Sequence, residues 1–191
     1  MDKIKYPKTD FFRKLGDANI EELIKRVSVL PESIWTAKNS RHQNKGAALV
    51  DASHIIFRFI KDFNNVYDYE DKALWDEWDD ALSSIMHQAA QALGYKEYVF
   101  PRIMLARLPA GACIHPHIDN HASYYVHKIH VPLMTNPKTI FHVDDQEMHM
   151  EVGHIIEVNN KKGHAVYNDG DTDRIHLIFE CYNKEDYGKP S

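Results

Sequence analysis

The sequence predicts a mainly β fold preceded by helices, because the hydrophobic pattern changes near residue 98. Before that point, apolar residues recur at helical spacing in two stretches, each followed by a stop signal. From Tyr98 onward, short runs rich in β-branched and aromatic residues alternate with turns, without a further helical pattern. The candidate strands are 98–108, 111–116, 124–134, 139–143, 147–151, 155–159, 164–168 and 174–182. Short antiparallel strands in this number, behind helices, indicate a double-stranded β-helix, the cupin-like jelly-roll.

Length and composition indicate a single domain over residues 1–191, long enough for a substantial core. We expect a helical brace with outer strands over 1–97, the jelly-roll core over 98–182 and a tail over 183–191. A net charge of −5 offers no basic surface for nucleic acid, and no apolar run reaches the ~20 residues of a membrane span. The N-terminus lacks the apolar core of a signal peptide, and the two cysteines are too few for a disulfide framework. These features predict a cytoplasmic protein with buried, structural cysteines.

A first helix is predicted over 17–28, capped by Asp17 and stopped by Pro31. Its apolar residues share one face: Ile20, Leu23, Ile24 and Val27. The polar stretch 34–44 is either a solvated connection or a loop at the mouth of a site, with Trp35 and Arg41 touching a substrate. The run 47–60 is rich in Val, Ile and Phe and supplies one or two strands.

A long second helix is predicted over 69–93, with Asp68 as its cap and Gly94 as its end. One apolar stripe follows it: Leu74, Trp75, Trp78, Ala81, Leu82, Ile85, Ala89 and Leu93. Tryptophans at helical spacing are usually core residues, so this helix is expected to brace one sheet.

Histidine is concentrated in one third of the chain, since ten of the 13 histidines lie between His115 and His176. Residues two apart on a strand point to the same face, so His117 and Asp119 can aim an imidazole and a carboxylate at one point. His164, from a distant strand, would complete a set of two histidines and one carboxylate. That set leaves half an octahedron open, which is typical of non-heme Fe(II) oxygenases.

A turn-rich run, 168–173, separates His164 from Arg174 and is typical of a hairpin turn. If the hairpin folds about Gly170, Val166 faces Arg174, and His164 and Arg174 share one face of the sheet. A guanidinium beside a metal suits a dicarboxylate cosubstrate, which chelates iron with one end and is gripped bidentately at the other. His176 follows Arg174 on the same face and either lines the pocket or supports the arginine.

Several segments, in this order, resemble one known family. They are Lys128-Ile-His-Val-Pro-Leu-Met-Thr-Asn136, Met150-Glu-Val-Gly153, Asn159 to His164, and Asp173-Arg-Ile-His-Leu-Ile178. Over roughly residues 98–182 the chain resembles the aspartyl/asparaginyl β-hydroxylases. These are Fe(II)- and 2-oxoglutarate-dependent dioxygenases with bacterial free-proline hydroxylases among their relatives.

The resemblance implies a jelly-roll enzyme that uses Fe(II), 2-oxoglutarate and O₂. The implied metal ligands are His117, Asp119 and His164. The implied cosubstrate-binding residues are Arg174, His130 and Lys128. Lys128 stands where many members carry arginine, and lysine lacks the bidentate fork. Such an enzyme hydroxylates an unactivated C–H bond of an amino acid, a related small molecule or a protein side chain, and releases succinate and CO₂.

Two other functions fit parts of the pattern. One is a cupin-type metal enzyme that does not use 2-oxoglutarate and binds its metal through His115, His117 and His164; His115 has the parity of His117 unless Pro116 distorts the strand. The run His164-Ala-Val-Tyr-Asn168 matches the second cupin motif, but the glutamate of the first motif is missing. The other is a catalytically silent barrel that only binds a ligand.

Substrate-selecting residues are expected in the loops 34–44 and 119–126, where Tyr124 and Tyr125 either reach the substrate or pack on the barrel. The substrate itself would be an amino acid, a peptide or a small molecule. Asn159 or Asn168 is expected to orient His164 through a hydrogen bond.

Overall fold

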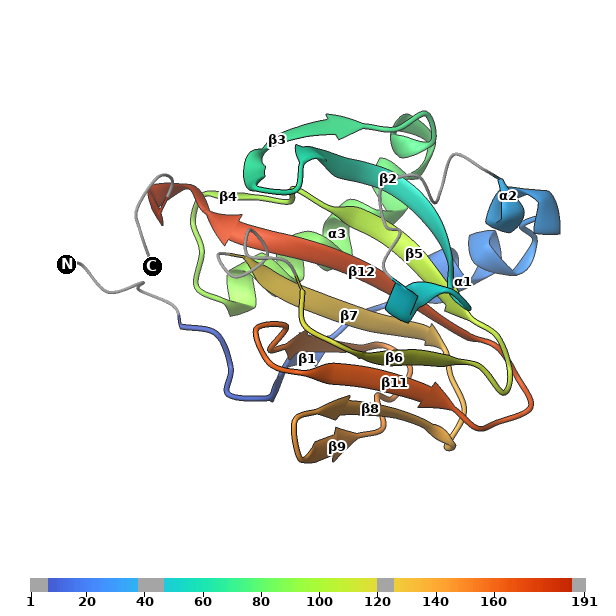
Figure 1. Ribbon diagram of the computed structural model, residues 1–191. Coiled ribbons are helices and arrows are strands. Elements are labelled where there is room, and N and C mark those ends of the chain that lie inside the picture. Colours follow the sequence, from blue (N-terminus) through green and yellow to red (C-terminus); the bar gives the residue numbers. More distant parts are fainter. Residues whose placement is uncertain (1–6, 38–46, 120–125, 187–191) are drawn as a thin grey trace.

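The computed structural model describes residues 7–37, 47–119 and 126–186. Within them, two antiparallel sheets lie face to face, and helices cover the outer side of the larger sheet (Figure 1). The large sheet has the strand order β1 (Phe12–Asp17), β10 (His154–Val158), β7 (His127–Met134), β12 (Arg174–Asn183), β5 (Ile103–Leu108), β2 (Ser53–Asp62) and β3 (Asn65–Asp71), with β4 (Tyr98–Val99) also paired to β12. The small sheet has the order β6 (Cys113–His117), β11 (His164–Asn168), β8 (Thr139–Val143) and β9 (Gln146–Met148). This arrangement is the predicted mainly β jelly-roll.

The helices differ from the prediction at their N-terminal ends. Helix α1 (Glu21–Ser28) starts four residues later than expected because Asp17 ends strand β1, and the Asn19 side chain accepts a hydrogen bond from the Glu21 N–H. Helix α3 (Trp75–Ala92) also starts late, since 65–71 forms strand β3. Asp68 therefore lies on a strand and pairs with Lys61 at 2.8 Å.

The reason for the second difference is pairing with β2. Val66, Tyr67 and Tyr69 are good strand formers, and they pack on Phe59 and Ile60 of β2. Pairing with a neighbouring strand thus outweighed a weak helical pattern.

Among the described residues, no helix combines the length and apolar character that crossing a membrane requires.

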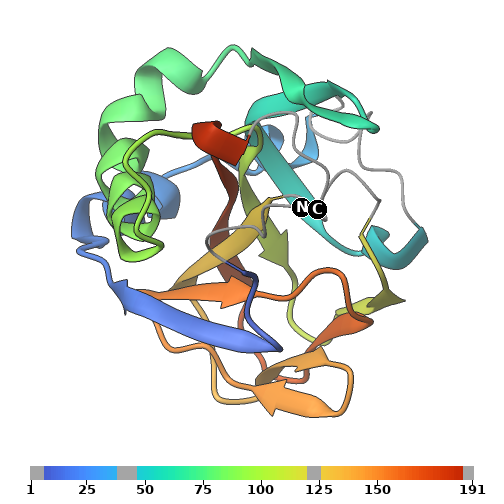
Figure 2. The ribbon, with the colours of Figure 1, turned by 90° about the vertical axis from the view of Figure 1, so that its left-hand side faces the viewer.

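Helix α3 braces the large sheet, as its apolar stripe predicts. Trp78, Leu82 and Ile85 face inward, and the Trp78 ring lies 5.3 Å from that of Phe57 on β2. Helices α1 and α2 (Glu32–Thr36) pack against the same layer, and Trp35 of α2 is buried there. Figure 2 shows α3 along the side of the large sheet, away from the small one. The helices therefore leave the space between the two sheets to other side chains.

The turn after β11 does not make a hairpin, contrary to the prediction. Strand β11 pairs with β6 and β8 in the small sheet, whereas β12 pairs with β5 and β7 in the large one. Residues 169–173 thus cross between the sheets. Asn168 holds this crossing, because its amide donates to the carbonyls of Pro109 (3.0 Å) and Thr172 (2.9 Å). His164 and Arg174 consequently come from opposite walls of the barrel.

Candidate functional site

A bulge in β6 decides which histidines face the barrel interior. His164 pairs with His117, but Val166 pairs with Ile114, so β6 has one extra residue in this interval. Such a bulge reverses the alternation of side chains, and Pro116 lies inside it. Ile114 and His117 therefore both turn inward, and His115 is exposed on the outer face. The alternative ligand set that contains His115 is wrong for this reason.

The structure brings His117, Asp119 and His164 together. One side-chain donor atom of each lies within 4.8 Å of the others. The Nε2 atoms of His117 and His164 are each 3.8 Å from Asp119 Oδ1, and the two ring centroids are 4.3 Å apart. Asp119 lies just beyond the end of β6, where its N–H donates to the Asn160 carbonyl at 3.3 Å. The backbone at Asn160 therefore fixes the position of Asp119, just beyond the end of β6, and with it the position of the carboxylate.

Backbone carbonyls orient both imidazoles. His117 Nδ1 is 2.8 Å from the His115 carbonyl, and His164 Nδ1 is 3.0 Å from the Lys162 carbonyl. A carbonyl oxygen only accepts, so both rings carry their proton on Nδ1 and leave a lone pair on Nε2. That lone pair points toward Asp119 in each case. Neither Asn159 nor Asn168 has this function, because their amides bind other carbonyls, those of Thr9 and Leu108 among them.

Two side chains hold the far oxygen of Asp119. Lys128 Nζ lies 2.5 Å from Oδ2, and the Asn160 amide donates to the same oxygen at 2.8 Å. Burial alone would raise the pKa of the Asp119 carboxyl, but the charge of Lys128 and these two hydrogen bonds lower it well below its usual range. Asp119 is thus an anchored carboxylate whose Oδ1 faces the imidazoles.

His164 and Asp119 are in the protonation states that bind metals. Burial lowers the pKa of His164 to about 4, more than the nearby Asp119 carboxylate raises it. His164 is therefore neutral at neutral pH, with an ionised carboxylate beside it. Neutral imidazole and ionised carboxylate are the protonation states that metal ligation requires.

Arg174 is a buried guanidinium with free donors. It begins β12 and is 1% exposed. Its Nη2 donates to His176 Nδ1 at 2.7 Å, whereas Nε and Nη1 have no hydrogen-bond partner among the described residues. Burial lowers its pKa to about 9, so the group is still charged at neutral pH. An unpaired charge in the interior is costly unless a ligand compensates it, and a carboxylate can accept from these free donors.

His130 lies on β7 beside this arginine. Both of its ring nitrogens are buried without a partner among the described residues. Burial first, and then the positive charges of Arg174 and Lys128, lower the pKa of His130 well below its usual value. Its ring is 5.2 Å from that of Phe141, which stacks on His164 at 6.2 Å. His130 therefore adds a neutral hydrogen-bonding group between the arginine and the His117–Asp119–His164 cluster.

Other residues predicted at the site are elsewhere or not described. Trp35 is buried on α2, and the Arg107 guanidinium carbon lies 4.8 Å from the centroid of the Trp35 ring. Trp35 is therefore a core residue rather than a loop residue. Arg41, Tyr124 and Tyr125 lie outside the described residues. His176 supports Arg174, which is one of the two expectations for it.

Sequence reasoning missed Asn160, Lys8 and the pair Arg102–Glu180. Lys8 donates to the Asn160 side chain from 152 residues away, and Arg102 Nη1 lies 2.6 Å from a Glu180 oxygen. Burial lowers the pKa of Lys8 to about 8, against the raising effect of Glu180 and Glu157. The sequence indicated only that Glu180 faces inward, since alternation along β12 puts it on the same face as Arg174. The residues that pair with one another here, Lys8 with Asn160 and Arg102 with Glu180, lie far apart in the chain, so neither segment alone indicates the pairing.

A jelly-roll that brings two imidazoles and one carboxylate together beside a buried arginine is typical of non-heme oxygenases. The sequence model of the aspartyl/asparaginyl β-hydroxylase family matches residues 80–184, which is more than half of the chain. The chain therefore belongs to this family of oxygenase enzymes. No curated protein matches the chain in sequence.

Solved structures share the fold. A 2OG-Fe(II) oxygenase family oxidoreductase from Burkholderia pseudomallei has a TM-score of 0.54 and 12% identity over 69% of this chain and 66% of its own. A prolyl-4-hydroxylase from Pseudomonas putida has a TM-score of 0.51 and 15% identity over 92% and 94%. The structure of EvdMO1 has a TM-score of 0.58 and 15% identity over 93% of this chain but 48% of its own. At these identities the similarity extends to the fold alone.

Proposed function

We propose that this protein is a Fe(II)- and 2-oxoglutarate-dependent dioxygenase that hydroxylates an unactivated C–H bond. One observation carries the proposal: two imidazole Nε2 atoms and Asp119 Oδ1 converge, while a buried arginine keeps two donors free. Family membership supports the same activity. The proposed metal ligands are His117, Asp119 and His164, and the proposed cosubstrate residues are Arg174 and His130.

The residues fit both groups. Two imidazoles and one carboxylate form a facial donor set that suits Fe(II) and leaves coordination positions for cosubstrate and O₂. The buried guanidinium of Arg174 keeps unpaired N–H donors on Nε and Nη1, from which a carboxylate can accept a charge-assisted hydrogen bond. When bound, Fe(II) and 2-oxoglutarate supply the activation of O₂ that converts C–H to C–OH and yields succinate and CO₂.

The chain's own residues supply geometry and charge. Arg174 binds the distal carboxylate of 2-oxoglutarate, and neutral His130 donates a further hydrogen bond to it. His176 keeps the guanidinium in place through its Nδ1 atom. Because Arg174 and His130 are almost fully buried, water competes little for these contacts.

Lys128 has a different function in this proposal from the one expected. It binds Asp119 Oδ2 together with Asn160, so the two side chains turn Oδ1 toward the imidazoles. Direct binding of 2-oxoglutarate by Lys128 stays a prediction. A lysine on the outer carboxylate oxygen offsets part of the negative charge without taking a coordination position.

We further propose an amino acid or a peptide as the substrate, because the family name refers to aspartyl and asparaginyl hydroxylation and the Pseudomonas putida structure is a prolyl-4-hydroxylase. A cytoplasmic location is proposed on the two free cysteines, which fit a reducing compartment.

Anaerobic titration with Fe(II) and 2-oxoglutarate tests the cofactor assignment. We expect a weak visible charge-transfer band in the wild type that Asp119→Ala abolishes. The matched control is Asp171→Ala, which removes an exposed aspartate and should leave the band unchanged. A wild type with no band and no affinity for 2-oxoglutarate would identify a silent barrel and overturn the proposal.

A succinate-release screen over the common amino acids and short peptides then tests the substrate class. We expect at least one free amino acid or peptide to raise succinate release above the uncoupled background. Product mass should increase by one oxygen atom. Coupled turnover on none of them, with an intact charge-transfer band, would refute the substrate class while leaving the cofactor assignment in place.

A further inference from the structure

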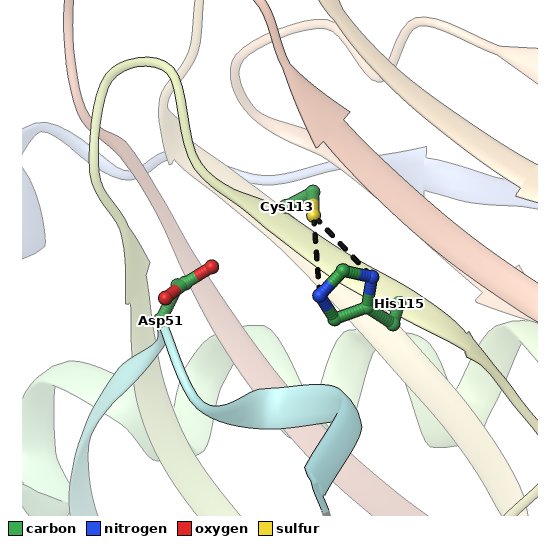
Figure 3. A group of neighbouring side chains, drawn as sticks. All are labelled: Asp51, Cys113 and His115. Atoms are coloured by element: carbon green, nitrogen blue, oxygen red, sulfur yellow. Dashed lines mark hydrogen bonds between the residues drawn. The ribbon is translucent and has the colours of Figure 1, made fainter.

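A second cluster of metal-binding side chains lies on the outer face of β6. Asp51, Cys113 and His115 each contribute one donor atom, and these atoms lie within 4.8 Å of one another. Figure 3 shows the Cys113 and His115 side chains next to each other on the strand, with Asp51 reaching from the turn before β2. Cys113 was expected to be buried, but it is half-exposed, in contrast to Cys181, which is 0% exposed.

The β6 bulge separates this cluster from the inner site. Ile114, between Cys113 and His115, points into the barrel and packs with Phe141 and Val166. The next inward side chain is His117. One strand therefore presents one set of donors to each of its faces, and the outer set shares no side chain with the inner one.

The distances suit a tetrahedral ion bound by sulfur and nitrogen. Cys113 Sγ is 3.7 Å from His115 Nδ1 and 3.8 Å from Nε2. Zn–S and Zn–N bonds of about 2.3 and 2.05 Å at a tetrahedral angle place sulfur and nitrogen about 3.6 Å apart. Because Sγ is almost equidistant from the two nitrogens, the His115 ring has to turn so that one of them faces the ion; its exposed position on the strand leaves room for this. Asp51 adds an oxygen donor from a different segment of the chain, so the cluster is more than a contact between two neighbours on one strand.

We propose that Asp51, Cys113 and His115 form a second metal site, which binds Zn²⁺ or a similar borderline-soft divalent ion. The thiolate favours such an ion over Mg²⁺ or Ca²⁺, and the fourth position is open to water. Binding ties the turn that follows the 3-10 helix η2 (Ala47–Leu49) to β6. This proposal is independent of the proposed function, because the inner site contains no sulfur.

Cobalt is a suitable probe because a thiolate ligand gives Co²⁺ an intense near-ultraviolet charge-transfer band that imidazole and carboxylate ligands do not. We expect full-length wild-type protein, kept reduced, to develop this band with one equivalent of thiolate-bound Co²⁺. Zn²⁺ should remove the band and raise the melting temperature, since an ion that binds only the folded state stabilises it. Absence of the band, or failure of Zn²⁺ to displace Co²⁺, overturns the proposal.

Variants assign the ligands. Cys113→Ser should abolish the band, whereas Cys181→Ala, which removes the other cysteine of the chain, should retain it. His115→Ala and Asp51→Asn should each weaken Co²⁺ binding at least ~10-fold, which is the smallest loss usual for removing even an outer-shell partner. Unchanged affinity in either variant overturns the three-ligand site. The Fe(II)–2-oxoglutarate band of Cys113→Ser should equal that of the wild type, so failure of one proposal is distinguishable from failure of the other.

Discussion

The two faces of β7 and β12 are equally buried but chemically opposite. On the outer face, under the helices, Val131, Leu177 and Phe179 are 0% exposed and belong to one apolar cluster. On the inner face of the same strands, Arg174 and Glu180 are no more than 2% exposed, although both carry charge. Every residue of β12 is buried, so burial alone does not distinguish the faces.

The difference shows how this fold separates stability from chemistry. Apolar burial on the outer face contributes about 25 cal/mol per Å² and requires no partner atoms of particular geometry. The inner face places charges at a cost that is repaid only through partners, as in Arg102–Glu180, or through a ligand, as we propose for Arg174. Substitutions on the two faces should therefore affect different measurements.

The largest effect is expected from Arg174→Met. Methionine keeps much of the volume but removes two charge-assisted hydrogen bonds to 2-oxoglutarate, worth about 3–6 kcal/mol together. The Kd for 2-oxoglutarate should rise roughly 10²- to 10⁴-fold in anaerobic titration, while urea unfolding shows stability equal to or above that of the wild type. Arg26→Met, at a partly exposed arginine paired with Asp80, is the control and should leave the Kd unchanged. An unaltered Kd in Arg174→Met would contradict the assignment of Arg174 as the inner-face charge that a ligand compensates.

Glu180→Gln tests an inner-face charge that has a protein partner. The substitution leaves the buried Arg102 guanidinium without its carboxylate, so the free energy of unfolding should fall by about 3–5 kcal/mol. Chemical denaturation measures this directly. A loss below about 1 kcal/mol would show that water reaches the pair and that the inner face is less isolated than its exposure indicates.

Leu177→Ala tests the outer face of β12. Its side chain is 0% exposed in the apolar cluster, so its truncation should cost about 2–5 kcal/mol by loss of burial and formation of a cavity. The folded variant should bind 2-oxoglutarate with an unchanged Kd at temperatures where it remains native. A substantial change in Kd would mean that the two faces are coupled through the backbone.

The smallest effect is expected from Glu157→Gln, at a point where the outer face itself carries charge. Burial would raise the pKa of Glu157, but His127 at 2.5 Å and Arg13 lower it below its usual value. A carboxyl with a lowered folded-state pKa stabilises the protein above its unfolded-state pKa of about 4.5, and this contribution is lost as pH falls through the folded-state value. Glu157→Gln should cost about 1.5–3 kcal/mol at pH 7. Below pH 4.5 the difference from the wild type should shrink, as urea denaturation across pH can show.

Local pattern was enough to predict much of the core. Strands 139–143 and 164–168 match the structure at both ends, since alternation and turn residues mark them directly. The stripe from Trp78 to Ile85 correctly predicted that α3 braces a sheet. The errors came where strand pairing decided the outcome: β1 pairs with β10 across about 140 residues, and pairing with the adjacent β2 makes β3 of residues predicted as the first turns of α3.

The site shows the same division. Its donor types were visible in the chain, because H-x-D followed by a distant histidine and an arginine is a spacing with chemical meaning. Their directions were not, since the alternation left open whether Pro116 distorts the strand, and only the pairing of β6 with β11 shows the bulge there. The assumed hairpin would have placed His164 and Arg174 on one sheet, whereas the crossing after β11 puts them on facing sheets.

By itself, the sequence determined the β-rich class, the bracing helix and the residue types that meet in the barrel, because periodicity and side-chain chemistry are local properties. Only the tertiary structure decided that His117 turns inward while His115 turns outward, and that Lys128 and Asn160 grip Asp119. These outcomes depend on which strands pair and in which register, and hydrogen bonds between segments as distant as Asp119 and Asn160 leave no trace in either segment alone.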